Sequence, residues 1–153
     1  MTNNIYSSND INNKQLDDRF KMLLSQLNIN LPFNKDNAIE ISYIDVNLSV
    51  YYENGLVVFY STFLLEYQPS AIFSQILLAT CKITEQPSIQ VSNTDNFEIT
   101  LWSREWLDKI DDNQFFEWIE RFGDVTRDWN RLIEEYNSKQ ELRKLIRIAR
   151  KSV

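Results

Sequence analysis

The change of hydrophobic period after Trp102 is the feature that most constrains how this chain folds. Phe97, Ile99 and Leu101 alternate with polar residues, which predicts a strand with one apolar face. From residue 111 onward the period becomes three to four, which predicts a helix with one wide apolar stripe: Phe115, Trp118, Ile119, Phe122, Val125, Trp129, Leu132, Ile133 and Tyr136. Asp111 and Gln114 have the spacing of a reciprocal helix cap. A strand therefore leads into a large aromatic helix.

The preceding residues add two helices and four strands. The predicted helices are 14–28 and 70–81, and the four predicted strands are 38–44, 48–53, 56–63 and 88–91; the strand before the last helix is 96–102. Asn54-Gly55 suits a two-residue hairpin, because both residues tolerate positive φ. Residues 92–95 have the composition of a turn. The order α-β-β-β-α-β-β-α indicates an α+β domain with an antiparallel sheet packed against helices.

The composition excludes most enzyme classes. The chain has no histidine, one cysteine (Cys81) and two glycines (Gly55 and Gly123). It therefore lacks the commonest general base, cannot build a Cys/His zinc cluster and cannot form a glycine-rich phosphate loop. We expect no catalytic residue, no cofactor and no metal site. Cys81 is expected to be a small buried hydrophobe.

The length of 153 residues indicates one domain. Residues 1–13 are polar and have no signal-peptide pattern, so they are expected to form a flexible leader before a domain at 14–137. No apolar run reaches the length of a membrane span, and a single cysteine forms no internal disulfide. We therefore expect a cytoplasmic protein in a reducing compartment.

Charge is distributed unevenly along the chain. The total is −6, and residues 138–153 contain six basic residues and one acidic residue (+5), so residues 1–137 carry −11. An acidic body disfavours nucleic-acid binding. Leu142, Leu145, Ile146 and Ala149 repeat at helical spacing among the basic residues, which predicts a basic amphipathic extension. This extension either continues the last helix and packs on the domain or dimer mate, or it contacts an acidic partner or an anionic membrane.

The element order, the acidic small chain and two segments resemble the class I type III secretion chaperones, the Tir-chaperone-like (CesT-type) family. The first segment, Leu77-Leu78-Ala79-Thr80-Cys81, ends the middle helix and has Thr80 where many relatives carry Asn. The second is the terminal aromatic block from Leu101 to Leu132. The resemblance covers about Leu16 to Glu135 and does not extend to the tail.

This resemblance implies a homodimer of the bacterial cytoplasm that binds the N-terminal segment of a secreted effector in extended form and keeps it competent for export. Such binding needs exposed apolar patches and an available sheet edge or groove. The candidate effector contacts lie on the first helix and the first strand: Phe20, Leu24, Ile39, Ile41, Tyr43 and Ile44. The simpler interpretation of these residues is burial in the core.

The middle helix is apolar on more than one face, which suits a dimer interface better than burial in one domain. The candidate dimer contacts are Phe73, Leu77, Ile89 and Val91. Burial under the sheet is the alternative for these residues too.

Two other functions remain open at the level of the sequence. An immunity or inhibitor protein that caps a folded basic toxin or enzyme would also be small, acidic and independent of histidine. A same-fold adaptor without a secretion role is the other. The state of the bound partner discriminates between the first two, because a chaperone holds an extended segment and an inhibitor holds a folded protein.

Overall fold

The computed structural model describes residues 8–27, 38–81, 84–95 and 97–151. Its elements are α1 (Ser8–Gln26), β1 (Ala38–Tyr43), β2 (Val46–Glu53), β3 (Leu56–Leu64), α2 (Ala71–Thr80), β4 (Gln90–Asp95), β5 (Glu98–Trp106), the short 3-10 helix η1 (Leu107–Lys109) and α3 (Asp112–Lys151). The predicted α+β class and element order are confirmed.

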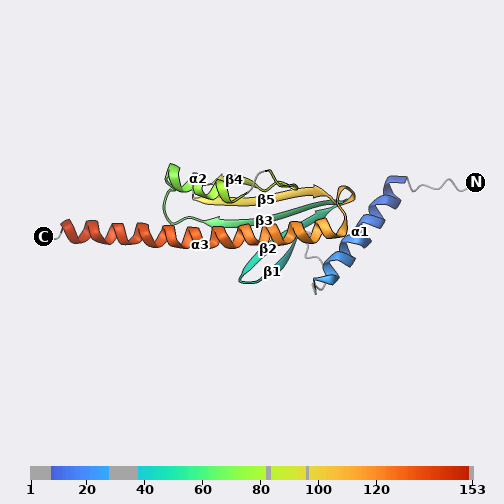
Figure 1. Ribbon diagram of the computed structural model, residues 1–153, viewed down its shortest axis with the longest axis horizontal. Coiled ribbons are helices and arrows are strands. Elements are labelled where there is room, and N and C mark those ends of the chain that lie inside the picture. The colour runs from blue at the N-terminus through green and yellow to red at the C-terminus, as the bar shows by residue number, and fades with distance from the viewer. Residues whose placement is uncertain (1–7, 28–37, 82–83, 96, 152–153) are drawn as a thin grey trace, which may run out of the picture.

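The five strands form one antiparallel sheet in the order β1-β2-β3-β5-β4. Helix α3 runs along the sheet and projects past its end, and α1 lies beside the start of α3 (Figure 1). Side chains of alternate strand residues, such as Val50, Phe59 and Leu101, are buried on the face toward α3. The sheet is thus covered on one face by helices.

Aromatic side chains fill the space between the sheet and α3. The ring of Phe59 lies 4.2 Å from that of Trp118 and 5.8 Å from that of Phe122 (centroid distances). The indole N–H of Trp118 donates to Ser103 Oγ at 2.8 Å, so this buried tryptophan also satisfies its polar atom. The aromatic stripe predicted on the last helix therefore forms the centre of the core.

Two local predictions are confirmed by the backbone. Asn54 and Gly55 both have positive φ (50° and 89°) in the turn between β2 and β3. Asp111 Oδ1 accepts from the amide of Gln114 at 2.8 Å, and Gln114 Oε1 accepts from the amide of Asp111 at 2.9 Å. Both signals are short-range, so they depend little on the rest of the fold.

Several predicted boundaries are wrong. Helix α1 begins at Ser8 rather than residue 14, so the predicted leader ends in a helix, and residues 1–7 lie outside the described part. Residues 92–95 belong to strand β4 rather than to a turn, because they pair with β5. The basic extension continues the last helix, which was one of the alternatives left open for it, and the two form a single 40-residue helix.

Gly123 allows β1 and α3 to approach closely. A Cβ atom at this position would lie 2.4 Å from Cδ1 of Tyr43. Such a contact is too short for any real side chain, so the Tyr43 ring occupies space that only a glycine leaves free. The end of β1 is thereby held against the helix.

Candidate functional site

Helix α2 has apolar residues on more than one side, but the described protomer covers only one of these sides. On the covered side, Phe73 stacks on Tyr136 with ring centroids 4.0 Å apart, and Thr80 Oγ1 accepts from the Trp129 indole at 2.7 Å. On the other sides, Ile72 is 73% exposed, and Ile76 and Leu78 are about half exposed. A helix with apolar residues on more than one side is normally buried on more than one side, so this outer surface has the composition of an interface.

The predicted dimer contacts lie mostly inside the protomer. Phe73, Leu77 and Ile89 are buried, and Val91 is partly buried on the edge strand β4. Helical spacing identified α2 as apolar on two faces but not which face its own domain covers. The exposed apolar residues of α2 are the ones that point outward, and they were not among the predicted contacts.

The predicted effector contacts divide into buried and accessible residues. Phe20 and Leu24 are fully buried, and Ile41 is nearly so. Ile39 and Tyr43 are partly buried at the edge of the core. Ile44, in the turn between β1 and β2, is 72% exposed. Of the six predicted effector contacts, those with accessible apolar surface in this protomer therefore lie on β1 and in the turn that follows it.

Ile44 is held in a backbone conformation that β-branched residues rarely adopt. Its φ is 53°, in the left-handed region that favours glycine at this position of a two-residue hairpin. This conformation costs about 1–2 kcal/mol for an ordinary residue. The turn displays an apolar side chain to solvent at a cost in backbone strain, which is typical of functional positions.

Contacts on both sides hold the Ile44 turn against α3. The Tyr43 hydroxyl donates to Asp124 at 2.8 Å, and Arg127 Nε donates to Asp45 at 2.7 Å. Burial and the neighbouring Asp124 carboxylate raise the pKa of Tyr43 to about 12, so its hydroxyl keeps its proton at neutral pH. Hydrogen bonding from Arg127 lowers the pKa of Asp45, which keeps this carboxylate charged. The turn is therefore fixed by two side chains that flank Ile44.

Strand β1 is one edge of the sheet. Among the described residues it pairs with β2 alone, so its outer edge has backbone groups without a strand partner. An extended peptide can add to such an edge through main-chain hydrogen bonds. The partly buried Ile39 and the exposed Ile44 border this edge with apolar area.

The sheet face that points away from α3 is also rich in aromatic residues. Its side chains come from alternate positions of β2, β3 and β5 and include Tyr51, Val58, Tyr60, Trp102 and Trp106. Trp106 is 46% exposed, and the Arg104 guanidinium lies 5.6 Å from the Trp102 ring. The prediction missed this surface, although the apolar residues at both odd and even positions of β3 were a signal for it.

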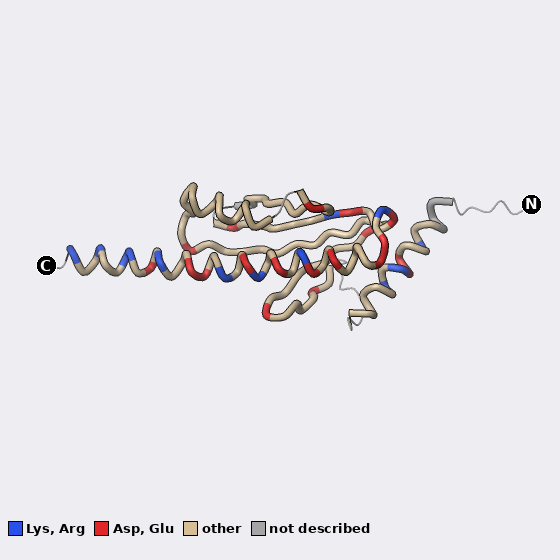
Figure 2. Tube along the Cα trace, in the orientation of Figure 1, with Lys and Arg blue, Asp and Glu red and all other residues tan. Residues whose placement is uncertain are grey.

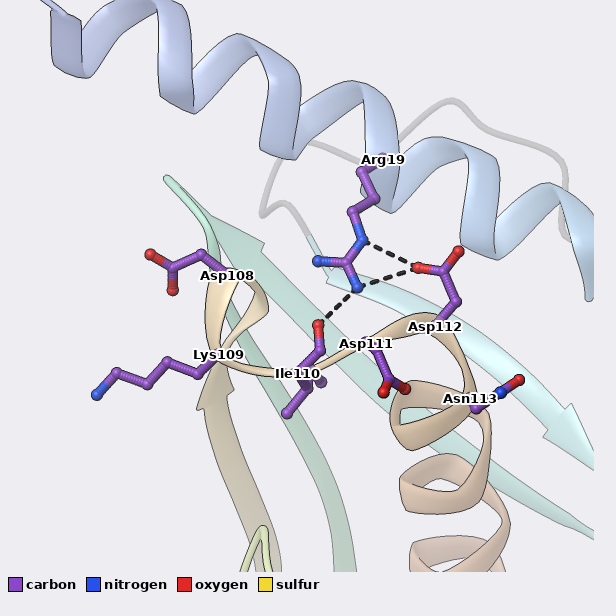
Figure 3. A pocket seen from close by; sticks show the side chains of 7 residues that line it. All are labelled: Arg19, Asp108, Lys109, Ile110, Asp111, Asp112 and Asn113. Atoms are coloured by element: carbon purple, nitrogen blue, oxygen red, sulfur yellow. Dashed lines mark hydrogen bonds and ion pairs between the residues drawn. The ribbon is translucent and has the colours of Figure 1, made fainter.

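Arg19 forms a polar site that fixes α1 to the start of α3 (Figure 3). Its guanidinium donates to the carbonyl oxygens of Leu107 at 2.6 Å and Ile110 at 2.7 Å, and to Asp112 Oδ1 at 3.0 Å. A cavity of about 750 Å³ adjoins this cluster. Arg19 provides hydrogen-bond donors for carbonyl oxygens in η1 and in the residues just before α3. The cluster is therefore a structural anchor that joins α1 to this region.

Removal of this anchor should weaken the fold. We expect Arg19→Met to lower the free energy of unfolding by about 2 kcal/mol, because bonds to a charged donor are lost and two carbonyls lose their partner. Urea unfolding followed by circular dichroism measures the effect. Lys21→Met, an exposed substitution on the same helix, is the control and should change stability little. Equal stabilities of the two variants would contradict the anchoring role.

No described helix is long and apolar enough to cross a membrane. Within the described ranges, no group of three or more His, Cys, Asp or Glu side chains is arranged to hold a metal ion. Cys81 is buried, as predicted, and burial raises the pKa of its thiol.

No family model and no curated protein matches this chain. Solved structures do match it. A chain of the heterodimeric ExoU–SpcU complex from the type III secretion system of Pseudomonas aeruginosa matches with a TM-score of 0.60 and 15% identity, over 74% of this chain and 97% of the other. A chain of the HopA1–SchA chaperone–effector complex matches with a TM-score of 0.58 and 11% identity, over 78% and 96%.

A third structure is the Yersinia pestis type III secretion chaperone SycH in complex with a stable fragment of YscM2. It matches with a TM-score of 0.54 and 10% identity, over 71% of this chain and 94% of the other. The chain is thus similar over most of its length to structures of type III secretion chaperones, and it has their fold. The fold expected from the sequence resemblance is confirmed.

Proposed function

We propose that the protein is a type III secretion chaperone that binds an extended segment of a secreted effector. The shared fold supports this proposal, and so does the strained, exposed Ile44 beside the outer edge of β1. A protein under no functional constraint has no reason to keep a β-branched, apolar residue at a turn position suited to glycine. The protein works through binding energy and needs no catalytic group.

The effector segment, expected at the effector's N-terminus, adds to the outer edge of β1. Its backbone bonds to the edge of the strand, and its apolar side chains contact Ile39, Tyr43 and Ile44. Phe20, Leu24 and Ile41 form the core beneath this edge. They would act as support for the site, and direct contact would require the edge to open.

We also propose that the protein is a homodimer and that the outer side of α2 is its interface. The exposed Ile72, Ile76 and Leu78 would supply the apolar centre of this interface. Phe73 and Leu77 would hold α2 on its own protomer through the opposite side of the helix. The α2 interface and the β1 edge are formed by different elements, so one dimer can hold effector segments at both edges.

Capture of the tagged protein's partner from its own host, followed by limited proteolysis of the complex, tests the proposal. The expected result is an effector protected only along an N-terminal segment. A folded partner whose activity is suppressed would instead support an inhibitor, and a complex with no protected segment would contradict a chaperone.

Substitution at the turn then tests the binding edge. Ile44→Asn should raise the free energy of unfolding by about 1 kcal/mol, because Asn tolerates positive φ, and should weaken binding of the protected segment at least tenfold. Phe97→Asn is a matched control, since Phe97 is also exposed, with φ of 67°, in the turn between β4 and β5. Isothermal titration calorimetry measures the affinity of both variants for the protected segment. Equal affinities of the two variants would remove the turn from the binding site.

A further inference from the structure

The turn after β1 determines which backbone groups of this strand point outward. Tyr43 pairs with Val46 across a two-residue turn, and the residues that close such a turn bond to each other through their backbones. Bonded and non-bonded pairs alternate along antiparallel strands, so Ser42 and Asn47 form a non-bonded pair, whose side chains lie close together. Accordingly, Ser42 Oγ donates to Asn47 Oδ1 at 3.3 Å. The backbone N–H and C=O groups of Glu40 and Ser42 therefore point to the outer edge.

Carboxylates lie on both sides of this edge. Glu40 is exposed in the middle of β1, on the sheet face that points away from α3, because its neighbour Ile41 is buried on the other face. On the α3 side, Asp124 accepts from the Tyr43 hydroxyl. The charges of Asp124 and Glu120 both contribute to the raised pKa of Tyr43, so the exposed Glu120 also lies near this hydroxyl. A strand added to β1 would meet a carboxylate on each of its two faces.

Little positive charge opposes these carboxylates. Of the described charged groups that act on the Tyr43 hydroxyl, Arg127 is the single cation, and it forms an ion pair with Asp45 at 2.7 Å. Figure 2 shows acidic residues on the β1–β2 hairpin and along the part of α3 that covers the sheet, and basic residues gathered on the projecting end of α3. The outer edge of β1 therefore lies in a negative field, which attracts a basic segment and repels an acidic one.

We propose that the β1 edge selects a basic effector segment, a strand in which apolar residues alternate with lysine or arginine. This inference rests on the proposed function and specifies the chemistry of the bound segment. Side chains of an added strand point alternately to the two faces of the sheet. Those on the α3 side would contact Ile39 and Tyr43, and those on the other face would lie beside Glu40. Near the turn, a long basic side chain has an apolar stem for the Tyr43 ring and a charged end for Glu120.

The carboxylates give specificity as well as attraction. Opposite charges directly across two neighbouring strands stabilise the pair, and like charges destabilise it. A basic segment therefore gains a favourable pair at Glu40, whereas an acidic segment would place a second carboxylate there. Rejection of wrong partners by like charge is a common basis of selective binding.

Protection of the edge is the competing explanation for Glu40. Charged side chains on edge strands prevent pairing with other copies of the chain. This explanation does not extend to Glu120, because that carboxylate belongs to α3 and lies on the opposite side of the edge. The two carboxylates have one common neighbour, which is a strand added to β1.

Three synthetic peptides, each about ten residues long with blocked ends, test the charge preference. In each peptide valine alternates with a second residue, which is lysine, glutamine or glutamate. We expect the full-length protein to bind the lysine peptide at least tenfold more tightly than the glutamine peptide, and the glutamate peptide more weakly still. Fluorescence anisotropy at low ionic strength measures the three affinities. The preference should shrink at high salt, because salt screens exposed charges.

Neutral substitutions at the edge test which carboxylates produce the preference. Glu40→Gln combined with Glu120→Gln should reduce the preference for the lysine peptide over the glutamine peptide at least fivefold. Glu66→Gln combined with Asp108→Asn is the matched control. Glu66 and Asp108 are exposed and follow β3 and β5, which do not adjoin β1 in the sheet. The control removes the same number of negative charges from the protein and should keep the preference.

A substitution at Ser42 tests whether the segment binds through the backbone of β1. Ser42→Pro removes the N–H that points to the outer edge, and proline is tolerated at edge positions of this kind. It should weaken binding of the lysine peptide at least tenfold. Ser42→Val keeps the N–H and should bind the peptide as the wild type does. Circular dichroism checks that both variants are folded.

The outcomes separate this inference from the proposed function. Equal affinities for the three peptides, or a preference unchanged in the Glu40/Glu120 variant, would overturn charge selection and leave strand addition in place. Binding that survives Ser42→Pro, or no binding of any peptide at millimolar concentration, would overturn strand addition at β1 itself. Increased self-association of Glu40→Gln in sedimentation velocity, with unchanged peptide affinity, would assign Glu40 to edge protection and overturn its role in selection.

Discussion

Replacement of both Ile72 and Ile76 by glutamate is expected to convert the proposed dimer into a monomer that remains folded. The two side chains are exposed in the protomer, so the substitutions leave its core intact. In an α2 interface they would place unpaired charges in an apolar contact. We expect the dimer dissociation constant to rise at least ~100-fold, which corresponds to about 3 kcal/mol. Light scattering after size-exclusion chromatography, over a range of concentrations, measures this change.

Met22→Glu is the matched control for this experiment. Met22 is an apolar residue that is 46% exposed on α1, outside the proposed α2 interface. This variant should keep the wild-type dissociation constant. If the Ile72/Ile76 double variant is folded by circular dichroism and still dimeric, the dimer uses another surface.

The sequence was sufficient for features whose cause is local. The turn at Asn54-Gly55 and the cap formed by Asp111 and Gln114 each depend on a few adjacent residues. The long period of the last helix, summed over many turns, also identified its buried side correctly, including Trp118 and Trp129. Element order followed from these signals.

Tertiary pairing explains the strand that was misplaced. Ser92 and Asn93 have the composition of a turn, but both residues pair with β5. An edge strand tolerates polar residues, because one of its sides faces solvent, and the neighbouring strand provides its hydrogen bonds. Local propensity could not reveal pairing partners that lie six and eight residues further along the chain.

The candidate site was predicted less well, because periodicity shows which side of an element is apolar but not what covers it. The stripe of Phe20 and Leu24 is covered by the domain itself, as are Phe73 and Leu77. The exposed Ile72 lies on the same helix as the two buried residues of α2. Ile44 was included in the predicted set for its apolar character, whereas its strained backbone could be recognised only in the structure.

The second large effect is expected at Gly123, a buried glycine within α3. In the middle of a helix, Gly→Ala normally stabilises by about 1 kcal/mol. Here the new methyl group would lie 2.4 Å from the Tyr43 ring, so that the ring or the helix must move. Overpacking of this kind costs about 1–3 kcal/mol, and the shift also breaks the bond from Tyr43 to Asp124. We expect Gly123→Ala to lower the free energy of unfolding by about 2 kcal/mol, measured by urea unfolding.

A double-mutant cycle separates the clash from any other effect of the substitution. In a Tyr43→Ala background the ring is absent, so Gly123→Ala should become neutral or stabilising through helix propensity alone. The interaction free energy between positions 43 and 123 should therefore be large. It should be opposite in sign to the stabilisation that alanine gains from its higher helix propensity. Stabilisation by Gly123→Ala in the wild-type background would contradict the close approach of β1 and α3. Because Tyr43 immediately precedes Ile44, a displaced ring would also release the strained turn, and Gly123→Ala should weaken effector binding without altering any residue on the binding edge.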